Sequence, residues 1–419
     1  MFKNGGSTAS IPFLVILLVE KHKLVQTIKG DEVSNMKMNF KKFLLLFMIL
    51  MISMNFLPLS TAKASVSVSA KSAVLIEQKS GRILYGKNAF EVRRIASITK
   101  IMTAILAIES GKIDEVVTVS NNAVRTEGSA IYLKPGEKIK LEDLLYGLML
   151  RSGNDSAVAI AEFIGGSVDG FVYLMNKKAE EIGMSKTHFA NPHGLDDHKD
   201  HFSTAYDMAI LTRYAMMDPT YRKIAGTKVH RAPNPTEKWD RVWKNKNRLL
   251  TEKYKYCTGG KTGFTKLAKR TLVTTATKGD MDLIAVTINA SSDWNDHIAM
   301  FEDAFKTFDI NEIVSDGKIS AVKDSFYKKN IYLKSAVEYP LTDKEADLVR
   351  VQYKMKKPKK SWKNSENIPD VVGSVVVYFN DEKIEYLPIY YRHPKKEKSS
   401  FFDIFGKIFT SVVGVKTDG

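Results

Sequence analysis

The chain has 419 residues, of which 44% are hydrophobic and 26% are charged, and its net charge is +16. This is enough chain for two or three domains with a sizeable core. The single cysteine, Cys257, excludes an intrachain disulfide and argues against a cysteine-based zinc site, and no His-Glu-x-x-His motif occurs. We therefore expect neither a metal nor another cofactor, and Cys257 is expected to be a buried apolar residue.

Residues 1–64 have the pattern of an N-terminal extension followed by a secretory signal peptide. Lysines precede an apolar run at residues 43–52, and the small residues of the Ala-Lys-Ala sequence at 62–64 follow it. This order predicts export with cleavage after residue 64, and Met36 or Met38 would be the natural start of such a signal. A retained membrane anchor is the alternative, which the shortness of the apolar run disfavours.

The charge of the exported part narrows the classes of partner. Residues 1–64 carry a net charge of +5, so the rest of the chain carries +11. A basic exported protein suits anionic surfaces such as cell-wall polymer or lipid headgroups. No zinc-finger, helix-turn-helix or aromatic RNA-binding motif occurs, so nucleic acid is not expected as a partner.

From residue 65 to residue 312 the periodicity alternates between strand and helix. It predicts a hairpin at 72–85, a helix from Ser97 to about Gly111, helices at 141–149, 156–164, 171–182 and 205–217, strands at 271–276 and 283–288, and a closing helix at 298–308. Asp155 is expected to cap the helix that begins at Ser156. Strands at both ends with helices between them predict an α+β fold, an antiparallel sheet that carries an inserted helical lobe.

Two further segments follow this domain. Residues 313–393 alternate apolar and polar positions and predict a small all-β C-terminal domain, with no catalytic constellation, that serves as a spacer or protein contact. Residues 394–419 combine a basic linker with apolar residues at helical spacing. The tail is too short and too often interrupted by charge to span a bilayer, so we expect an amphipathic helix on an anionic membrane surface. Docking on the protein's own core is the alternative.

Ser97 and Lys100 stand three residues apart at the start of a long apolar helix. On a helix these positions share a face, and the surrounding core would desolvate Lys100 enough for it to act as a base on a nucleophilic serine. The Ser-x-x-Lys motif alone proves little, because it also occurs at Ser34, Ser60, Ser315, Ser320 and Ser325.

Two more motifs make the combination specific. Ser152-Gly153-Asn154 follows in an interhelical loop, and Lys261-Thr262-Gly263 follows at a predicted strand. In this order and context the three motifs resemble those of penicillin-binding D-alanyl-D-alanine carboxypeptidases of the low-molecular-mass serine type, peptidase family S11. The resemblance spans the exported chain, and the segment at 266–272 is similar to the sporulation-associated branch.

The resemblance implies a β-lactamase/transpeptidase-like fold and a role for each motif. Ser97 would attack the bond between the last two D-alanines of a peptidoglycan stem peptide, and Lys100 would be its base, although assignment of the base differs among such enzymes. Ser152 would relay a proton to the leaving amine, and Asn154 would bind the substrate amide and orient Lys100. The positive charge of Lys261 would keep Lys100 neutral.

The resemblance also implies the rest of the substrate site. The backbone N–H groups of Ser97 and Phe264 would form the oxyanion hole, and Gly263 would let the substrate lie along the strand. Lys261 and Thr262 would bind the terminal carboxylate. Many relatives place an arginine one strand and helix further on, where this chain has none, so Arg270 is the expected substitute.

The expected function is therefore a serine D-alanyl-D-alanine carboxypeptidase at the outer face of the cytoplasmic membrane, or at the membrane around a forespore. Its substrates would be peptidoglycan stem peptides, and β-lactams would inhibit it by acylating Ser97. The alternatives are a serine β-lactamase, which the C-terminal domain and anchor disfavour, and a non-catalytic β-lactam sensor or wall-binding protein, which the intact motifs disfavour.

Overall fold

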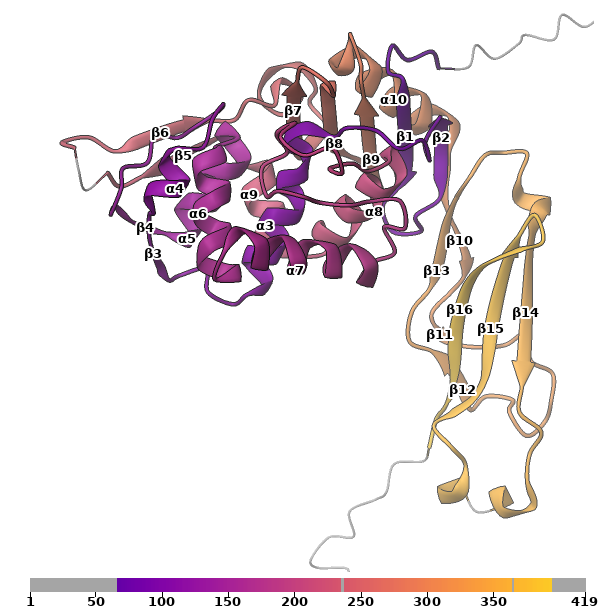
Figure 1. Ribbon diagram of the computed structural model, residues 1–419. Coiled ribbons are helices and arrows are strands. Elements are labelled where there is room, and N and C mark those ends of the chain that lie inside the picture. Colours follow the sequence, from indigo (N-terminus) through magenta and orange to yellow (C-terminus); the bar gives the residue numbers. More distant parts are fainter. Residues whose placement is uncertain (1–65, 235–236, 364, 394–419) are drawn as a thin grey trace, which may run out of the picture. The chain divides into compact units, whose positions relative to one another are not determined.

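The computed structural model describes residues 66–234, 237–363 and 365–393, so the expected signal peptide and membrane anchor lie outside the described residues. A five-stranded antiparallel sheet with the strand order β2-β1-β9-β8-β7 crosses the first domain (Figure 1). Its strands are β1 (Ser72–Glu77), β2 (Ile83–Lys87), β7 (Cys257–Thr265), β8 (Lys269–Lys278) and β9 (Met281–Ile288). The first and last strands of this domain thus pair with each other, as the α+β prediction requires.

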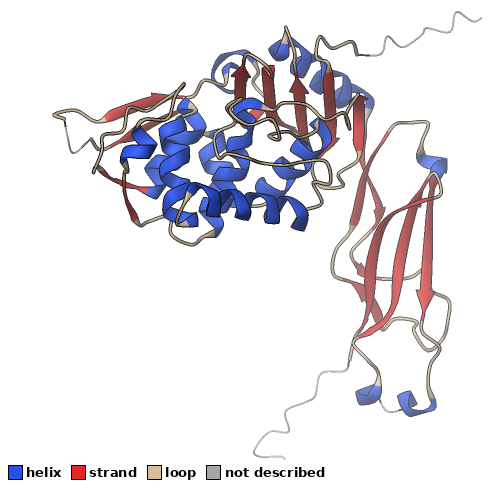
Figure 2. Cartoon of the chain, in the orientation of Figure 1, coloured by secondary structure: helices blue, strands red, loops and turns tan. Residues whose placement is uncertain are grey.

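Helices cover both faces of this sheet, because alternate strand residues are apolar on both sides (Figure 2). Val74 and Ile76 of β1 face the larger core, in which α8 (Ala205–Ala215) packs on β1 and β9. Leu75 faces the smaller core, in which α10 (Asp293–Thr307) packs on β8 and β9. The α+β class with an antiparallel sheet and a helical lobe is thereby confirmed.

The helical lobe lies between β2 and β7 in the chain. It contains the 3₁₀ turn η1 (Ala96–Thr99), α3 (Lys100–Glu109), α4 (Asn121–Val124), α5 (Leu141–Tyr146), the π-helical turn η2 (Gly147–Arg151), α6 (Asn154–Gly165), α7 (Val168–Glu181), α9 (Pro219–Gly226) and the π-helical turn η3 (Leu249–Lys253). Two hairpins accompany them, formed by β3 (Val116–Thr118) with β4 (Lys138–Lys140) and by β5 (Val229–Ala232) with β6 (Arg241–Lys244).

Two local expectations differ from the structure. The helix expected at 298–308 begins five residues earlier, at Asp293. The N-cap of α6 is Gly153, so Asp155 is not the cap; it lies in the first turn, and its carboxylate accepts a hydrogen bond from the Ser156 N–H group. Residues 219–253, for which no helix or strand is predicted, form α9, the β5–β6 hairpin and η3.

The chain leaves α10 directly into a second, β-rich domain. It contains the paired strands β10 (Asp309–Val314) and β13 (Val337–Leu341), and a sheet with the order β11-β12-β16-β15-β14. The sheet strands are β11 (Gly317–Lys318), β12 (Ile331–Leu333), β14 (Val349–Met355), β15 (Val371–Phe379) and β16 (Glu382–Tyr391). Buried residues of these strands form a separate hydrophobic core, so the expected all-β C-terminal domain is present.

No single helix among residues 66–234, 237–363 and 365–393 is long and apolar enough to span a bilayer. Taken together, α6 and α7 meet the length and hydropathy criteria, but they meet at an angle of 84°.

Three buried histidines link the stability of the first domain to pH. Burial is the main cause that lowers the pKa of His193, His201 and His297 to about 3 each. His297 is on α10 and packs on β8 and β9, where its ring nitrogens contact the Thr274 hydroxyl at 2.6 Å and the Thr287 hydroxyl at 2.9 Å. The unfolded chain therefore takes up protons below its ordinary histidine pKa of 6.5, while the folded chain does not.

We expect the free energy of unfolding to fall as the pH is lowered from about 7 to about 5, by roughly 1 kcal/mol per pH unit for each buried histidine. The urea midpoint should fall with it. The stabilisation is complete above pH 6.5 and is lost as the pH falls toward 3. Chemical denaturation followed by fluorescence measures this. His297→Gln should flatten the dependence by about a third, whereas the same change at the partly exposed His188 should not. Equal midpoints at the two pH values would contradict the account.

Candidate active site

The turn that carries Ser97 is held in place from two sides. Ala96 has a φ of 51°, and the Thr99 hydroxyl donates to the Ala96 carbonyl at 2.7 Å. The His201 ring nitrogen Nε2 lies 2.8 Å from the same hydroxyl. On the other side Gly194, with a φ of 87°, lies so close that a Cβ atom there would be 1.9 Å from the Ala96 oxygen. These contacts fix the position of Ser97 at the start of α3.

Lys100 is fully buried, and its amine has three oxygen neighbours. Nζ lies 2.6 Å from Oδ1 of Asn154, 2.7 Å from the carbonyl oxygen of His193 and 3.1 Å from Oγ of Ser97. Burial lowers the pKa of Lys100 well below its ordinary value of 10.5, and the charges of Lys261 and Lys246 lower it further. A neutral amine has two hydrogens and one lone pair. Because the amide and the carbonyl oxygens can only accept, the lone pair is left for the Ser97 hydroxyl.

Ser152 and Lys261 form a second contact beside the first. Ser152 follows η2 in the left-handed conformation, with a φ of 64°. The Lys261 amine donates to the Ser152 hydroxyl at 3.0 Å and to the Thr262 carbonyl at 2.7 Å. Burial, and then the charge of Lys246, lower the pKa of Lys261 to about 7. Each of the two lysine amines thus contacts a serine hydroxyl, and burial lowers the pKa of both amines.

Asn154 links Lys100 to the loop at residues 127–133, which borders the pocket. Its Nδ2 donates to the Glu127 carbonyl at 2.6 Å, and its backbone N–H donates to the Ser129 carbonyl at 2.6 Å. The carboxylate of Asp155, the next residue, accepts from the backbone N–H groups at 131 and 133. This buried carboxylate therefore fixes the loop over the site rather than capping the helix.

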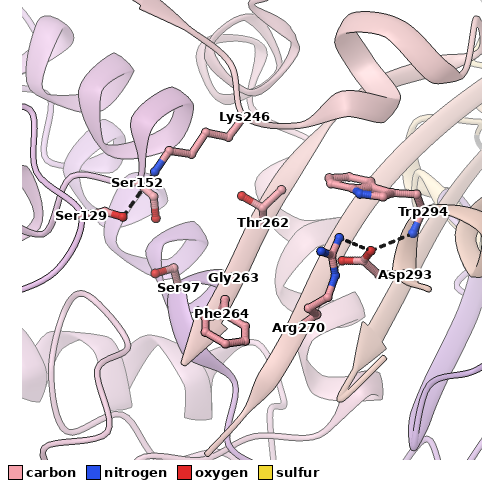
Figure 3. A pocket seen from close by; sticks show the side chains of 10 residues that line it. All are labelled: Ser97, Ser129, Ser152, Lys246, Thr262, Gly263, Phe264, Arg270, Asp293 and Trp294. Carbon is pink, nitrogen blue, oxygen red and sulfur yellow. Dashed lines mark hydrogen bonds and ion pairs between the residues drawn. The ribbon is translucent and has the colours of Figure 1, made fainter. Parts of the chain in front are cut away.

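The edge strand β7 closes the pocket, which has a volume of about 330 Å³ (Figure 3). A Cβ atom at Gly263 would lie 2.4 Å from the Thr271 hydroxyl and 2.9 Å from the backbone nitrogen of Ser97. The missing side chain is thus what lets β7 lie against η1. Figure 3 shows Thr262, Gly263 and Phe264 along the strand facing Ser97, and the Phe264 side chain is 65% exposed.

Arg270 lines the same pocket but is already paired. One guanidinium nitrogen lies 2.5 Å from the Asp293 carboxylate, which also accepts from the Trp294 backbone N–H. The guanidinium lies 5.6 Å from the centre of the Trp294 ring, and its Nε is buried without a partner among the described residues. The expected carboxylate-binding arginine is therefore in the pocket, but a carboxylate of the protein holds it.

Lys246 is a pocket residue that the sequence analysis missed. It follows the β5–β6 hairpin, its backbone N–H donates to the Leu150 carbonyl at 3.1 Å, and its amine donates to the Ser129 hydroxyl at 3.3 Å (Figure 3). Burial, and then the charge of Arg151, lower its pKa. No motif surrounds it, and only the tertiary fold brings it beside Ser152.

Two residues considered in the sequence have structural positions. His193 contributes its backbone carbonyl to Lys100, while its ring Nδ1 accepts from the Leu195 N–H at 3.2 Å. Cys257 is buried, and burial raises the pKa of its thiol to about 11. In the described part of the chain no group of three or more histidine, cysteine or acidic residues is placed to hold a metal.

Comparison with known proteins agrees with this geometry. The family model described as Peptidase_S11, D-alanyl-D-alanine carboxypeptidase, matches residues 59–292. The chain belongs to this carboxypeptidase family. The carboxypeptidase DacF of Bacillus subtilis is 38% identical over 307 residues, which are 68% of this chain and 78% of DacF. DacC of Escherichia coli is 33% identical over 346 residues, 77% of this chain and 83% of DacC.

Solved structures of similar proteins extend the likeness to the fold. Penicillin-binding protein 5 from Haemophilus influenzae superposes with a TM-score of 0.64 at 28% identity, covering 78% of this chain and 97% of that protein. The carboxypeptidase DacD from Francisella tularensis gives a TM-score of 0.59 at 26% identity, covering 79% and 94%. The β-lactamase/transpeptidase-like fold is thus confirmed for this S11 carboxypeptidase.

Gly263→Ala should separate β7 from η1. The new methyl group overlaps the Thr271 hydroxyl and the Ser97 backbone, so the strand must shift. We expect a loss of about 1–3 kcal/mol in stability and of about 10²-fold in activity, because the reacting groups are displaced. Thermal unfolding and D-alanine release measure the two effects.

Gly86→Ala is the matched control in β2. A Cβ atom there would meet only side-chain carbons at 3.8 Å and 3.9 Å, so stability and activity should change little. A fully active Gly263→Ala would show that the close approach of β7 to η1 is not required.

Proposed function

We propose that this S11 carboxypeptidase removes the terminal D-alanine of peptidoglycan stem peptides through an acyl-enzyme on Ser97. The observation that carries the proposal is the Lys100 amine, whose two acceptor partners leave its lone pair for the Ser97 hydroxyl. Ser97 Oγ attacks the carbonyl carbon of the penultimate D-alanine as its proton passes to Lys100. The backbone N–H groups of Ser97 and Phe264 stabilise the negative charge that develops on the carbonyl oxygen.

The second pair of residues serves the leaving group. When the tetrahedral intermediate collapses, the C–N bond breaks and the leaving nitrogen takes a proton from the Ser152 hydroxyl. Lys261 donates to that hydroxyl at 3.0 Å and restores its proton, while Lys261 and Thr262 also face the substrate's terminal carboxylate. Asn154 orients Lys100 through Oδ1 and binds the substrate amide.

Hydrolysis completes the cycle with the same groups. Before hydrolysis, the proton that Lys100 took from Ser97 returns through Ser152 to Lys261, so that Lys100 is neutral again. Lys100 then takes a proton from water as the water oxygen attacks the ester carbonyl, and it gives this proton to Ser97 Oγ as the ester bond breaks. A β-lactam acylates Ser97 in the same way, but its amine stays tethered to the acyl group. It therefore blocks the pocket, which accounts for inhibition by penicillins.

We further propose that the protein acts outside the cytoplasmic membrane. The support is the signal-peptide pattern of residues 1–64 and the basic, apolar-periodic pattern of residues 394–419, which suits an anionic membrane surface. The domain over residues 313–393 would be a spacer between that surface and the catalytic domain, residues 65–312.

Cosedimentation of the protein with anionic vesicles should require residues 394–419. Equal binding by a chain that lacks these residues would contradict the proposed membrane anchor.

A role in the spore cortex is the narrower proposal. It rests on the resemblance of the segment at 266–272 to the sporulation-associated branch, and the 38% identity with DacF of Bacillus subtilis is compatible with it. Cortex peptidoglycan from spores that lack the protein should be more cross-linked. Unchanged cortex muropeptides would contradict the cortex role but not the proposed acyl-enzyme mechanism.

The function is tested by D-alanine release from diacetyl-Lys-D-Ala-D-Ala. The wild-type protein should release D-alanine, and Ser97→Ala should lose the activity by several orders of magnitude, because no other group can form the acyl-enzyme. Ser361→Ala, at an exposed serine of the C-terminal domain, is the control and should keep full activity.

The other outcomes point to the alternative functions. Rapid turnover of penicillin without D-alanine release would indicate a β-lactamase. Stable acylation without release of either product would indicate a β-lactam sensor or wall-binding protein. Retention of D-alanine release by Ser97→Ala would contradict the mechanism.

A further inference from the structure

One end of the C-terminal domain is rich in lysine. Residues 323–330, 356–362 and 391–393 meet there, at the end of the sheet where β16 finishes (Figure 1). The Arg392 N–H donates to the Asn330 carbonyl at 2.6 Å, and the Tyr327 hydroxyl donates to the Lys356 carbonyl. We call this part of the domain the basic end. Its exposed cations are Lys323, Lys328, Lys329, Lys356, Lys357, Lys359, Lys360 and Arg392.

Aromatic rings hold the three segments of the basic end together. The ring of Phe326 lies 5.0 Å from that of Tyr327, 6.0 Å from that of Trp362 and 6.3 Å from that of Tyr391. Tyr327 and Trp362 are buried. The lysines therefore stand on segments that are packed against one another, and their charges are held close together on one surface.

The charge of the basic end is not balanced by its own acids. In the described part of the chain none of its cations forms an ion pair with a carboxylate. Asp324 accepts from the Phe326 backbone N–H at 2.9 Å, and the nearby Asp370 is paired with His393 at 3.2 Å. Like charges gathered in this way repel one another, so an anionic partner that binds them is favoured.

The other end of the same sheet has the opposite charge. Residues 342–348 and 380–382 form the turns there, where β14 begins and β15 ends. Lys344 is the one cation in these turns, and their acids are Asp343, Glu345, Asp347, Asp381 and Glu382. An anionic surface therefore attracts one end of the domain and repels the other, which favours an end-on orientation.

The position of the basic end in the chain favours a membrane as the anionic surface. The chain leaves this end at His393, and residues 394–419, for which we proposed a membrane anchor, follow directly. Residues 394–400 separate His393 from Phe401, the first large apolar residue of the tail, and a segment of this length reaches at most about 25 Å. A tether this short gives the basic end an effective concentration near millimolar at the surface, so that even weak binding to lipid headgroups is productive.

We propose that the basic end is a second membrane-binding surface, which binds anionic lipid headgroups beside the C-terminal tail. The C-terminal domain then stands on the membrane by this end instead of turning freely on the tail. This inference rests on the location outside the cytoplasmic membrane that is proposed above.

The test measures binding of the exported chain, residues 65–419, to vesicles of phosphatidylcholine with one quarter phosphatidylglycerol. The triple variant Lys357→Gln, Lys359→Gln and Lys360→Gln should lower the partition coefficient about 10- to 100-fold, because each lysine near an anionic surface adds to binding. The difference should vanish on pure phosphatidylcholine and at about 1 M salt, where charges are screened within roughly 3 Å.

A matched control removes the same charge elsewhere. Lys138→Gln, Lys177→Gln and Lys199→Gln change exposed lysines of the first domain and should alter the partition coefficient less than about twofold, because a charge beyond the Debye length contributes little. Both triple variants should release D-alanine from the soluble peptide at the wild-type rate.

Three results would overturn the inference. Unchanged binding of the first variant would mean that the tail alone binds the membrane, and an equal loss in the control would mean that only net charge matters. Weaker binding of the first variant to soluble polyglycerol phosphate, with vesicle binding unchanged, would make the partner a wall polymer. Failure of the wild-type protein to bind the anionic vesicles would instead overturn the proposed location itself.

Discussion

Burial of the Lys100 amine among three oxygen atoms is the interaction on which the rest of the site depends. An ammonium group in this position would be desolvated and close to two further lysines, so the neutral form is favoured. The neutral amine then has one arrangement that satisfies its neighbours, with both hydrogens on acceptors and its lone pair on Ser97. The fold thus leaves the Lys100 amine able to accept the Ser97 proton, as the proposed mechanism requires.

Three separated segments must meet for this arrangement to exist. Ser97 and Lys100 lie at the junction of η1 and α3, Ser152 and Asn154 lie at the junction of η2 and α6, and β7 supplies Lys261. Two close contacts hold η1, because Gly194 and Gly263 lie so near to it that neither has space for a side chain. Asp155 holds a further segment in place, because its buried carboxylate accepts hydrogen bonds from the loop that borders the pocket.

The sequence predicts those parts of the molecule that depend on local pattern. The short apolar run at 283–288 and the longer apolar run after Lys100 are local signals, and they predict β9 and α3. The order of the three motifs identifies the family for the same reason. Local pattern does not predict the contacts of Asp155 and Lys246, because their partners lie 22 and 117 residues away in the chain. The ion pair between Arg270 and Asp293 is a further example, since only the packing of α10 on β8 shows that this arginine is engaged.

The most direct test of the central claim is the pH dependence of acylation by a fluorescent penicillin, followed by mapping of the labelled peptide. The label should be found on Ser97, and the rate should reach its plateau well below pH 10.5, the ordinary pKa of a lysine, because Lys100 is already neutral there. Label on another residue, or a rate that still rises with pH toward 10.5, would contradict a neutral, buried Lys100 as the base.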